Sequence, residues 1–217
     1  QGYVRPDGQV GIRNELWILP MVGCVNGVAE TMAKALKREG LPGTVEDVVV
    51  MPHPFGCSQL GHDMENTQKI LAGLARHPNA GGILLLWLGC ENNTPEAFMK
   101  VLGEVDPRRV KTLICQKVSD ELDAGLALLR GLAAEAGRCQ RQAVPLSELK
   151  IGFKCGGSDA FSGLTANPLV GRICDQLTAA GGYAVLTEVP EMFGAETILF
   201  NRCATPEVFG QAVAMVN

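Results

Sequence analysis

The regular alternation of short apolar runs with longer helical stretches constrains the fold of this chain more than any other feature. Four apolar runs are each followed by a segment of helical character, and they occupy residues 16–22, 45–51, 82–88 and 110–115. The third run is apolar throughout, as is typical of a strand buried on both faces. Strands separated by helices of this length predict right-handed βαβ units. We therefore predict an α/β fold, with a parallel β-sheet and helices on both of its faces in Rossmann-like layers.

The pattern restarts after a polar link at residues 141–147. Strands are predicted at residues 150–153 and 183–188, with a glycine-rich loop and a helix between them. We therefore predict that residues 1–148 form a first α/β domain and that residues 149–217 begin a second one. The sequence lacks an initiator Met, and its last helical stretch has no capping residue. We expect a piece of a longer polypeptide in which the second domain is truncated.

Capping residues predict where two of the helices start. Asn93 or Thr94 precedes a helix that has Pro95 at its first position. Ser119 is the predicted cap of the helix that reaches Gly137.

The composition excludes several classes of protein. Hydrophobic residues make up 47% of the chain and charged residues 19%, which fits a globular protein and excludes disorder. The formal net charge is −4 and no basic stripe is present, so nucleic acid and an anionic membrane are not expected partners. The longest apolar stretch, residues 83–88, is too short to span a bilayer, and the polar N-terminus is not a signal peptide. We expect a cytoplasmic protein.

The cysteines of a cytoplasmic chain are better interpreted as ligands, nucleophiles or small buried hydrophobes than as disulfides. Four of the eight lie beside a glycine near a predicted strand end: Cys24, Cys57, Cys90 and Cys155. Because parallel strands bind ligands at their carboxyl ends, these thiolates could converge on iron or zinc. Small residues are also needed where strands turn tightly into helices, so packing alone would explain each cysteine.

Charged and polar groups suited to acid–base work and anion binding complete the pattern. His53 lies between two prolines, which stiffen its backbone and favour a held side chain. Arg13 and Lys154 are candidates for holding a carboxylate. Carboxylates at strand ends could serve as acid or base: Glu91, Asp159, Glu188 and Glu191. The Gly-x-Gly-x-x-Gly signature and the Walker loop are absent, which disfavours nucleotide cofactors.

Several blocks of this sequence resemble the catalytic region of the altronate/galactarate dehydratase family. Residues 3–14, YVRPDGQVGIRN, resemble the signature with which that region opens. The other resembling blocks are PMVGCVN (20–26), GCS (56–58), LGCE (88–91), KCGGSDAFSG (154–163) and LTEVPEMFGAE (186–196). The resemblance covers nearly the whole chain, and its first block is more similar to altronate than to galactarate dehydratases.

The resemblance implies a hydro-lyase that dehydrates a sugar acid, altronate to 2-keto-3-deoxygluconate. The reaction would abstract the α-proton and expel the β-hydroxyl with the help of iron, either as Fe²⁺ or as an iron–sulfur cluster. Galactarate dehydratase and sulfolactate sulfo-lyase of the same family are alternatives. The family also implies a larger protein, with an N-terminal SAF-type domain or small SAF subunit and further C-terminal sequence, and we expect this chain to lack them. A homo-oligomer is a further expectation.

Roles for individual residues follow from the matching blocks. The expected metal ligands are Cys24, Cys57, Cys90 and Cys155. The expected acid–base groups are His53, Glu188 and Asp159. The expected substrate-binding residues are Arg13, Asn14, Lys154 and Ser158. Two interpretations from other classes stay open: a structural or oligomerisation fragment that is inactive without the missing domains, and a metal-binding redox module.

Overall fold

The computed structural model describes residues 1–154, 157 and 159–217. The chain forms two compact units, Gln1–Val144 and Pro145–Asn217, here called unit 1 and unit 2. Each unit is described by itself. The predicted domain limits, 1–148 and 149–217, remain predictions, because compact units in the structure are not by themselves domain assignments.

Unit 1 is built around a parallel sheet of four strands, which are β3 (Glu15–Pro20), β4 (Val48–Val50), β5 (Ala80–Trp87) and β6 (Val110–Ile114). The strands lie in the order β4-β3-β5-β6. Leu16 pairs with Val48 on one side and with Gly82 on the other, so the first strand lies inside the sheet. The chain winds outward from β3 first in one direction and then in the other. The point of reversal between β3 and β5 is where open α/β sheets bind their ligands.

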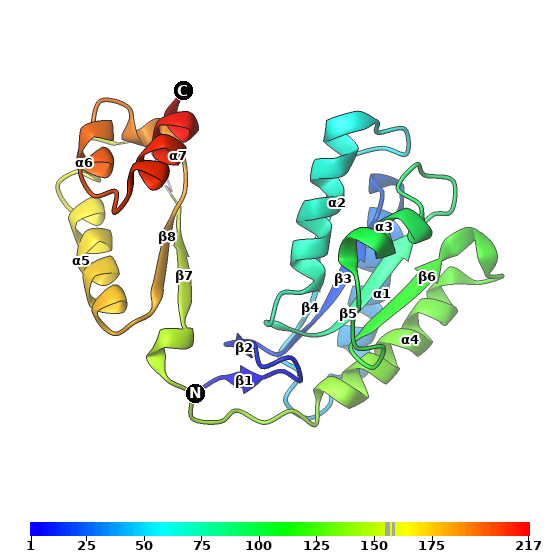
Figure 1. Ribbon diagram of the computed structural model, residues 1–217. Helices are drawn as coiled ribbons and strands as arrows, with labels where there is room; N and C mark the ends of the chain where they lie inside the picture. Colours follow the sequence, from blue (N-terminus) through cyan, green and yellow to red (C-terminus); the bar gives the residue numbers. More distant parts are fainter. Residues whose placement is uncertain (155–156, 158) are drawn as a thin grey trace. The chain divides into compact units, whose positions relative to one another are not determined.

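Helices cover both faces of this sheet (Figure 1), and they are α1 (Asn26–Glu39), α2 (Gly61–Ala75), α3 (Pro95–Leu102) and α4 (Glu121–Ala136). Met32 of α1 and Leu132 of α4 share one buried cluster with Leu84 of β5. Leu71 of α2 shares the other cluster with Leu85, the next residue of β5. Consecutive residues of β5 therefore enter opposite cores, which is why this strand is apolar throughout. The predicted α/β fold with helices on both faces is confirmed.

The helix starts agree with their predicted caps in one case and differ in the other. Thr94 caps α3, and Pro95 occupies its first position. The cap of α4 is Asp120 and not Ser119, so that prediction was wrong by one residue. The Asp120 carboxylate accepts two backbone N–H groups of the first turn at 3.0 and 2.9 Å. A carboxylate at this position also interacts favourably with the helix dipole, which a serine hydroxyl does less well.

A short antiparallel pair at the N-terminus was not predicted. It joins β1 (Tyr3–Val4) to β2 (Val10–Gly11). Strands of two residues carry no periodic pattern from which they could be recognised. Single-turn 3₁₀ helices occupy Gly23–Val25, Cys115–Lys117, Leu146–Glu148 and Val189–Met192.

Unit 2 contains two parallel strands, β7 (Lys150–Phe153) and β8 (Tyr183–Leu186), which are connected through α5 (Ala166–Ala179). Two further helices follow, α6 (Glu196–Phe200) and α7 (Pro206–Val216). In Figure 1, α5 lies alongside the two strands, and α6 and α7 lie beyond their carboxyl ends. The predicted start of a second α/β unit is confirmed. None of the helices in the described part of the chain is long and apolar enough to cross a membrane.

Candidate functional site

Three neighbouring loops meet at the carboxyl edge of the unit 1 sheet, and each carries one of the predicted metal ligands. Cys24 lies on the 3₁₀ turn after β3, Cys57 in the loop after β4, and Cys90 in the loop after β5. All three are exposed free thiols. Because β4, β3 and β5 are adjacent in the sheet, these loops are neighbours at the predicted ligand-binding edge.

Hydrogen bonds lock these loops to one another. The Gly23 N–H donates to the Phe55 carbonyl oxygen at 2.8 Å, and the Asn92 N–H donates to that of Cys57 at 2.9 Å. A Cβ atom at Gly23 would lie 2.9 Å from the His53 carbonyl oxygen. Glycine therefore precedes Cys24 because two loop backbones approach each other closely there.

The His53 side chain is held by the chain itself. Its Nδ1 accepts the Phe55 N–H at 3.3 Å, and its Nε2 lies 3.0 Å from the Pro20 carbonyl oxygen. This pattern assigns the proton of the neutral imidazole to Nε2. To act as a base, His53 would have to exchange one of these contacts for a substrate.

The side chain of Asn26, which the sequence did not single out, lies at the same edge. Its Nδ2 donates to the His53 carbonyl oxygen at 2.9 Å. Its Oδ1 is buried and has no hydrogen-bond partner among the described residues. A buried acceptor without a partner is suited to a donor from a ligand, such as a hydroxyl. In the sequence, the only indication of this site was an asparagine at the turn between a strand and a helix.

The turn that carries Cys90 is held by Glu91. This carboxylate is 6% exposed and accepts the N–H groups of Leu88 and Gly89 at 2.9 and 2.6 Å. Glu91 therefore holds the loop and is not available as an acid or base. Burial raises the pKa of the nearby Cys115 thiol, and the charges of Glu121 and Glu91 raise it further. That cysteine stays a protonated, buried small hydrophobe.

The described residues do not complete an iron site. Soft thiols suit iron, yet no group of three or more His, Cys, Asp or Glu side chains in the described part of the chain is placed to hold a metal ion. Cys155, the fourth predicted ligand, lies outside the described residues. Cys24, Cys57 and Cys90 thus lie near one edge of the sheet, and their role as metal ligands stays a prediction.

Two predicted substrate-binding residues lie at the other edge of the sheet. Arg13 and Asn14 precede β3, whereas the Cys24 loop follows it. Asn14 is fully buried, and its Nδ2 donates to the Ala136 carbonyl oxygen at 2.8 Å. Arg13 is exposed and pairs with Glu46 at 3.3 Å. A strand of six residues spans about 20 Å, so unit 1 does not bring these residues to the thiols.

The carboxyl edge of unit 2 brings two predicted residues together. The Lys154 Nζ donates to Glu188 Oε1 at 2.9 Å, from the ends of the adjacent parallel strands β7 and β8. Glu188 has φ 66° and ψ 68° and is the one non-glycine residue with positive φ in the described part of the chain. A left-handed backbone at a non-glycine residue is costly and is often found at functional sites. Of the predicted site residues, Lys154 and Glu188 are therefore the pair whose arrangement best fits a catalytic role.

Asp159 has a local structural task in the loop that follows β7. Its Oδ1 accepts the N–H groups of Phe161 and Ser162 at 2.8 and 2.9 Å. It therefore caps a turn in the way that Asp side chains commonly do. Ser158 lies outside the described residues.

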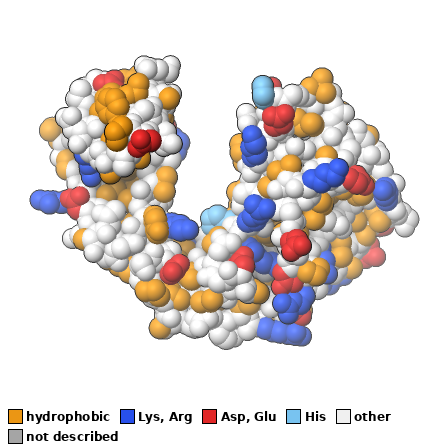
Figure 2. All heavy atoms as spheres, viewed as in Figure 1, with side chains coloured by type: hydrophobic (Ala, Val, Ile, Leu, Met, Phe, Trp, Pro, Cys, Tyr) orange, Lys and Arg blue, Asp and Glu red, His pale blue; other side chains and the backbone are white. Residues whose placement is uncertain are grey.

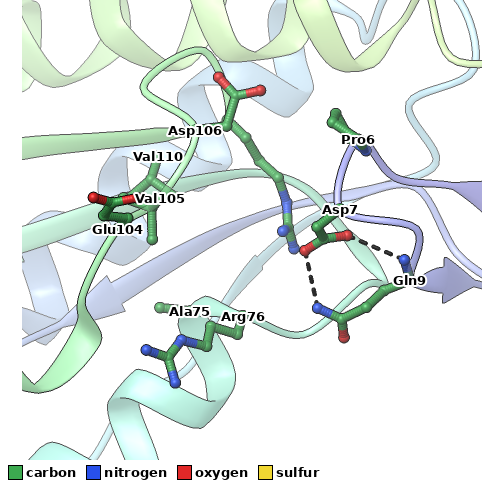
Figure 3. Close-up of a pocket in the computed structure, with 10 residues that line it drawn as sticks. Pro6, Asp7, Gln9, Ala75, Arg76, Glu104, Val105, Asp106 and Val110 are labelled. Carbon is green, nitrogen blue, oxygen red and sulfur yellow. Dashed lines mark hydrogen bonds between the residues drawn. The ribbon is translucent and has the colours of Figure 1, made fainter.

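A hollow of about 410 Å³ lies at the amino edge of the unit 1 sheet. Figure 3 shows the residues that line it. Its lining includes two arginines and three acids, namely Arg76, Arg109, Asp7, Glu104 and Asp106. The Arg109 guanidinium donates to the carbonyl oxygens of Ala80 and His77, and burial lowers its pKa. The lining carries both positive and negative charges, and the Arg109 guanidinium already donates to backbone carbonyl oxygens. The hollow is therefore not an anion site.

Comparison with known proteins gives matches along the whole chain. The family model described as "D-galactarate dehydratase/Altronate hydrolase, second domain" matches residues 2–137, and the one described as "D-galactarate/Altronate dehydratase, C-terminal" matches residues 146–217. The chain is 56% identical to the altronate dehydratase of Bacillus subtilis (strain 168) and 50% identical to that of Escherichia coli (strain K12). Both matches cover 100% of this chain and 44% of the relative. The galactarate dehydratase (L-threo-forming) of Escherichia coli (strain K12) is 34% identical over 96% of this chain and 42% of its own length.

Proposed function

The chain belongs to the D-galactarate dehydratase/altronate hydrolase family, and on that premise we propose that it forms part of a hydro-lyase that removes water from a sugar acid. The observation that carries the proposal is the whole-chain identity of 56% and 50% to two altronate dehydratases. The chain spans less than half the length of these relatives, so activity belongs to a larger protein that contains it.

Altronate, converted to 2-keto-3-deoxygluconate, is the proposed substrate. Identity to the two altronate dehydratases exceeds the 34% identity to the galactarate dehydratase by a wide margin. Galactarate and sulfolactate are the alternatives to be compared in the assay, because related pockets separate such acids by the placement of single polar groups.

Glu188 is the proposed base, and Lys154 the proposed anchor of the substrate carboxylate. A proton α to a carboxylate is weakly acidic, so its removal needs a placed base and a cation near the developing negative charge. The Lys154 Nζ and Glu188 Oε1 atoms lie 2.9 Å apart. The backbone of Glu188 is left-handed, an unfavourable conformation that persists only where the surrounding structure holds it. A substrate carboxylate would bind the Lys154 ammonium, and the Glu188 carboxylate would accept the proton.

The loops at the carboxyl edge of the unit 1 sheet, which carry Cys24, Cys57 and Cys90, are proposed separately as a site for hydroxyl recognition and iron. The buried Oδ1 of Asn26 supports a contact with a substrate hydroxyl. His53 is proposed as an acid–base group of this edge. Iron as Fe²⁺ or as a cluster stays a proposal that needs Cys155 or ligands from polypeptide outside this chain.

The proposal is tested in a chimera that carries this chain in place of the matched span of the Bacillus subtilis altronate dehydratase. We expect turnover of altronate above that of galactarate or sulfolactate, and no turnover by the chain alone. Glu188→Gln should lower kcat by about 10²–10⁴-fold, which is the usual contribution of a general base to the rate. Lys154→Met should chiefly raise KM. Glu148→Gln, which removes an exposed carboxylate of the same unit, is the control.

Two results would overturn parts of this proposal. A chimera that is folded but inactive on all three acids would favour a structural or oligomerisation role. Full activity in Glu188→Gln would remove Glu188 as the base without touching family membership.

Iron is tested separately by metal analysis of the same chimera. Replacing Cys24, Cys57 and Cys90 together with Ser should lower the iron content of the purified protein, because a hydroxyl is a much poorer ligand for iron than a thiolate. Cys203→Ser, on a cysteine outside the three loops, is the control. Unchanged iron in the triple variant would show that these thiols are not ligands.

A further inference from the structure

The small sheet of unit 2 has one face that nothing in the described part of the unit covers. Tyr183 pairs with Lys150, and Val185 pairs with Gly152. Side chains alternate along strands, so these four residues share one side of the sheet and are here called the open face. Tyr183 is 59% and Val185 52% exposed. A Cβ atom added to Gly152 would meet no other atom within 4 Å.

Such a face is unusual for a parallel sheet. Parallel strands are found almost only where both faces are covered, and a two-stranded sheet is marginal in water. In the described part of unit 2, only Leu177 and Gly182 are buried. Apolar side chains instead lie on the surface, and Figure 2 shows a group of them over the end of the unit that holds α6 and α7. The unit therefore removes little apolar surface from water, and burial of such surface is the main favourable contribution to folding.

Gly152 indicates what kind of element would cover the face. A glycine inside a strand weakens it, and it is typical of places where another backbone approaches closely. The open face presents Gly152 beside the larger Tyr183 and Val185. A helix whose axis crosses above the glycine would contact both larger side chains.

Unit 1 buries the apolar faces of its own sheet. Its sheet is already covered on both faces by its own helices, with two separate buried clusters. Its large exposed apolar residues, such as Leu60 and Ile70 on α2 and the loop before it, are scattered among polar side chains. Scattered apolar residues are normal for a protein surface and form no matching patch.

We propose that the open face binds an amphipathic helix from the polypeptide that the altronate dehydratases carry outside the matched span. More than half of each of these relatives lies outside that span, since the chain covers 44% of them. Parallel sheets grow by units of a helix and a strand, so a helix from that polypeptide is the expected cover for the open face.

The experiment is co-expression of this chain, affinity-tagged, with the part of the Bacillus subtilis altronate dehydratase outside the matched span. The wild-type chain should recover that polypeptide at 1:1 stoichiometry in size-exclusion chromatography with light scattering. Val185→Lys would bury an unpaired ammonium and Gly152→Leu would fill the space of the helix, so each should reduce recovery about tenfold or more. Ile70→Lys on α2, which places the same charge at a 64% exposed site, should leave recovery unchanged.

Other occupants give different results, and each overturns the proposal. A dimer of the chain alone that Val185→Lys dissociates would make a second copy the occupant. A lower melting temperature of the chain alone in Val185→Lys, but not in Ile70→Lys, would make unit 1 the occupant. The absence of a complex with the wild-type chain, or full recovery with both open-face variants, would exclude the proposed helix. None of these measurements uses enzymatic activity, so they stand apart from the test of the hydro-lyase.

Discussion

At the scale of single residues, the opening block of the sequence serves the fold of unit 1. Arg5 is 3% exposed, and its guanidinium donates to the Pro78 carbonyl, the Asn14 side chain and the Arg13 carbonyl at 2.7, 3.0 and 2.9 Å. Burial lowers the pKa of Arg5, although an arginine remains charged in proteins. The guanidinium fork ties the β1–β2 turn to the start of β3. Arg5 is thereby unavailable to a substrate.

Arg5→Lys should lower the free energy of unfolding by about 2 kcal/mol, because an ammonium cannot reproduce three bonds in a planar fork and leaves buried acceptors unpaired. Urea denaturation monitored by circular dichroism measures the change. Arg13→Lys, at a side chain 59% exposed, should stay within about 0.5 kcal/mol of the wild type. Equal effects of the two substitutions would contradict this assignment.

Glu46 makes the stability of unit 1 depend on pH. Partial burial raises the pKa of this carboxyl, but hydrogen bonds from Arg141, Arg13 and Tyr3 outweigh burial and hold its pKa below the ordinary 4.5. A lowered pKa in the folded state means that the contribution is complete above the unfolded value and is lost as the pH falls through the folded one.

Glu46→Gln should therefore cost about 1 kcal/mol at neutral pH and progressively less in acid, since a protonated Glu46 no longer attracts the arginines. Urea denaturation at several pH values between neutral and the acid limit of folding measures this difference. Glu30→Gln, which removes an exposed carboxylate of α1, controls for net charge. Parallel pH curves for Glu46→Gln and the wild type would contradict the prediction.

At the scale of secondary structure elements, α4 shows how finely a helix start depends on geometry. Asp120→Ala should reduce stability by about 1 kcal/mol, because two N–H groups of the first turn lose their acceptor. Ser119→Ala is the matched control one residue away and should have little effect, since Ser119 is outside the helix and is not its cap. Denaturant midpoints of the two variants decide the matter. A larger loss of stability in Ser119→Ala than in Asp120→Ala would show that Ser119 is the cap.

The strands and helices of unit 1 were largely predictable, and their arrangement was less so. The apolar runs around β3, β5 and β6 and the cap of α3 are local patterns, and local patterns survive folding when packing agrees with them. The β1–β2 pair is too short for a pattern, and the order β4-β3-β5-β6 is a property of pairing between distant segments.

At the scale of the whole molecule, the two units differ in how much they bury. Core strands of unit 1 contain fully buried side chains, such as those of Ile18 and Leu85, whereas β8 exposes three of its four residues. Local stability follows buried apolar contacts. Amide protons of β3 and β5 should therefore exchange only on global unfolding, and those of β7 and β8 should exchange far sooner.

Hydrogen exchange of the chain alone, read by mass spectrometry of peptides from both units, measures this difference. Adding the co-expressed partner polypeptide should slow exchange in β7 and β8 and leave β3 and β5 unchanged. Equal protection of both units in the chain alone would show that unit 2 is stabilised by something other than its own burial.

The sequence by itself determined the α/β class, the second α/β unit and the family, because hydrophobic periodicity and motif wording are properties of short segments. It also placed Cys24, Cys57 and Cys90 at strand ends, which the structure locates at one edge of the sheet. Only the tertiary structure decided that Arg13 and Asn14 lie at the opposite edge and that Lys154 contacts Glu188. The reason is that neighbours across a sheet are fixed by strand order and direction, which bring together residues far apart in the chain.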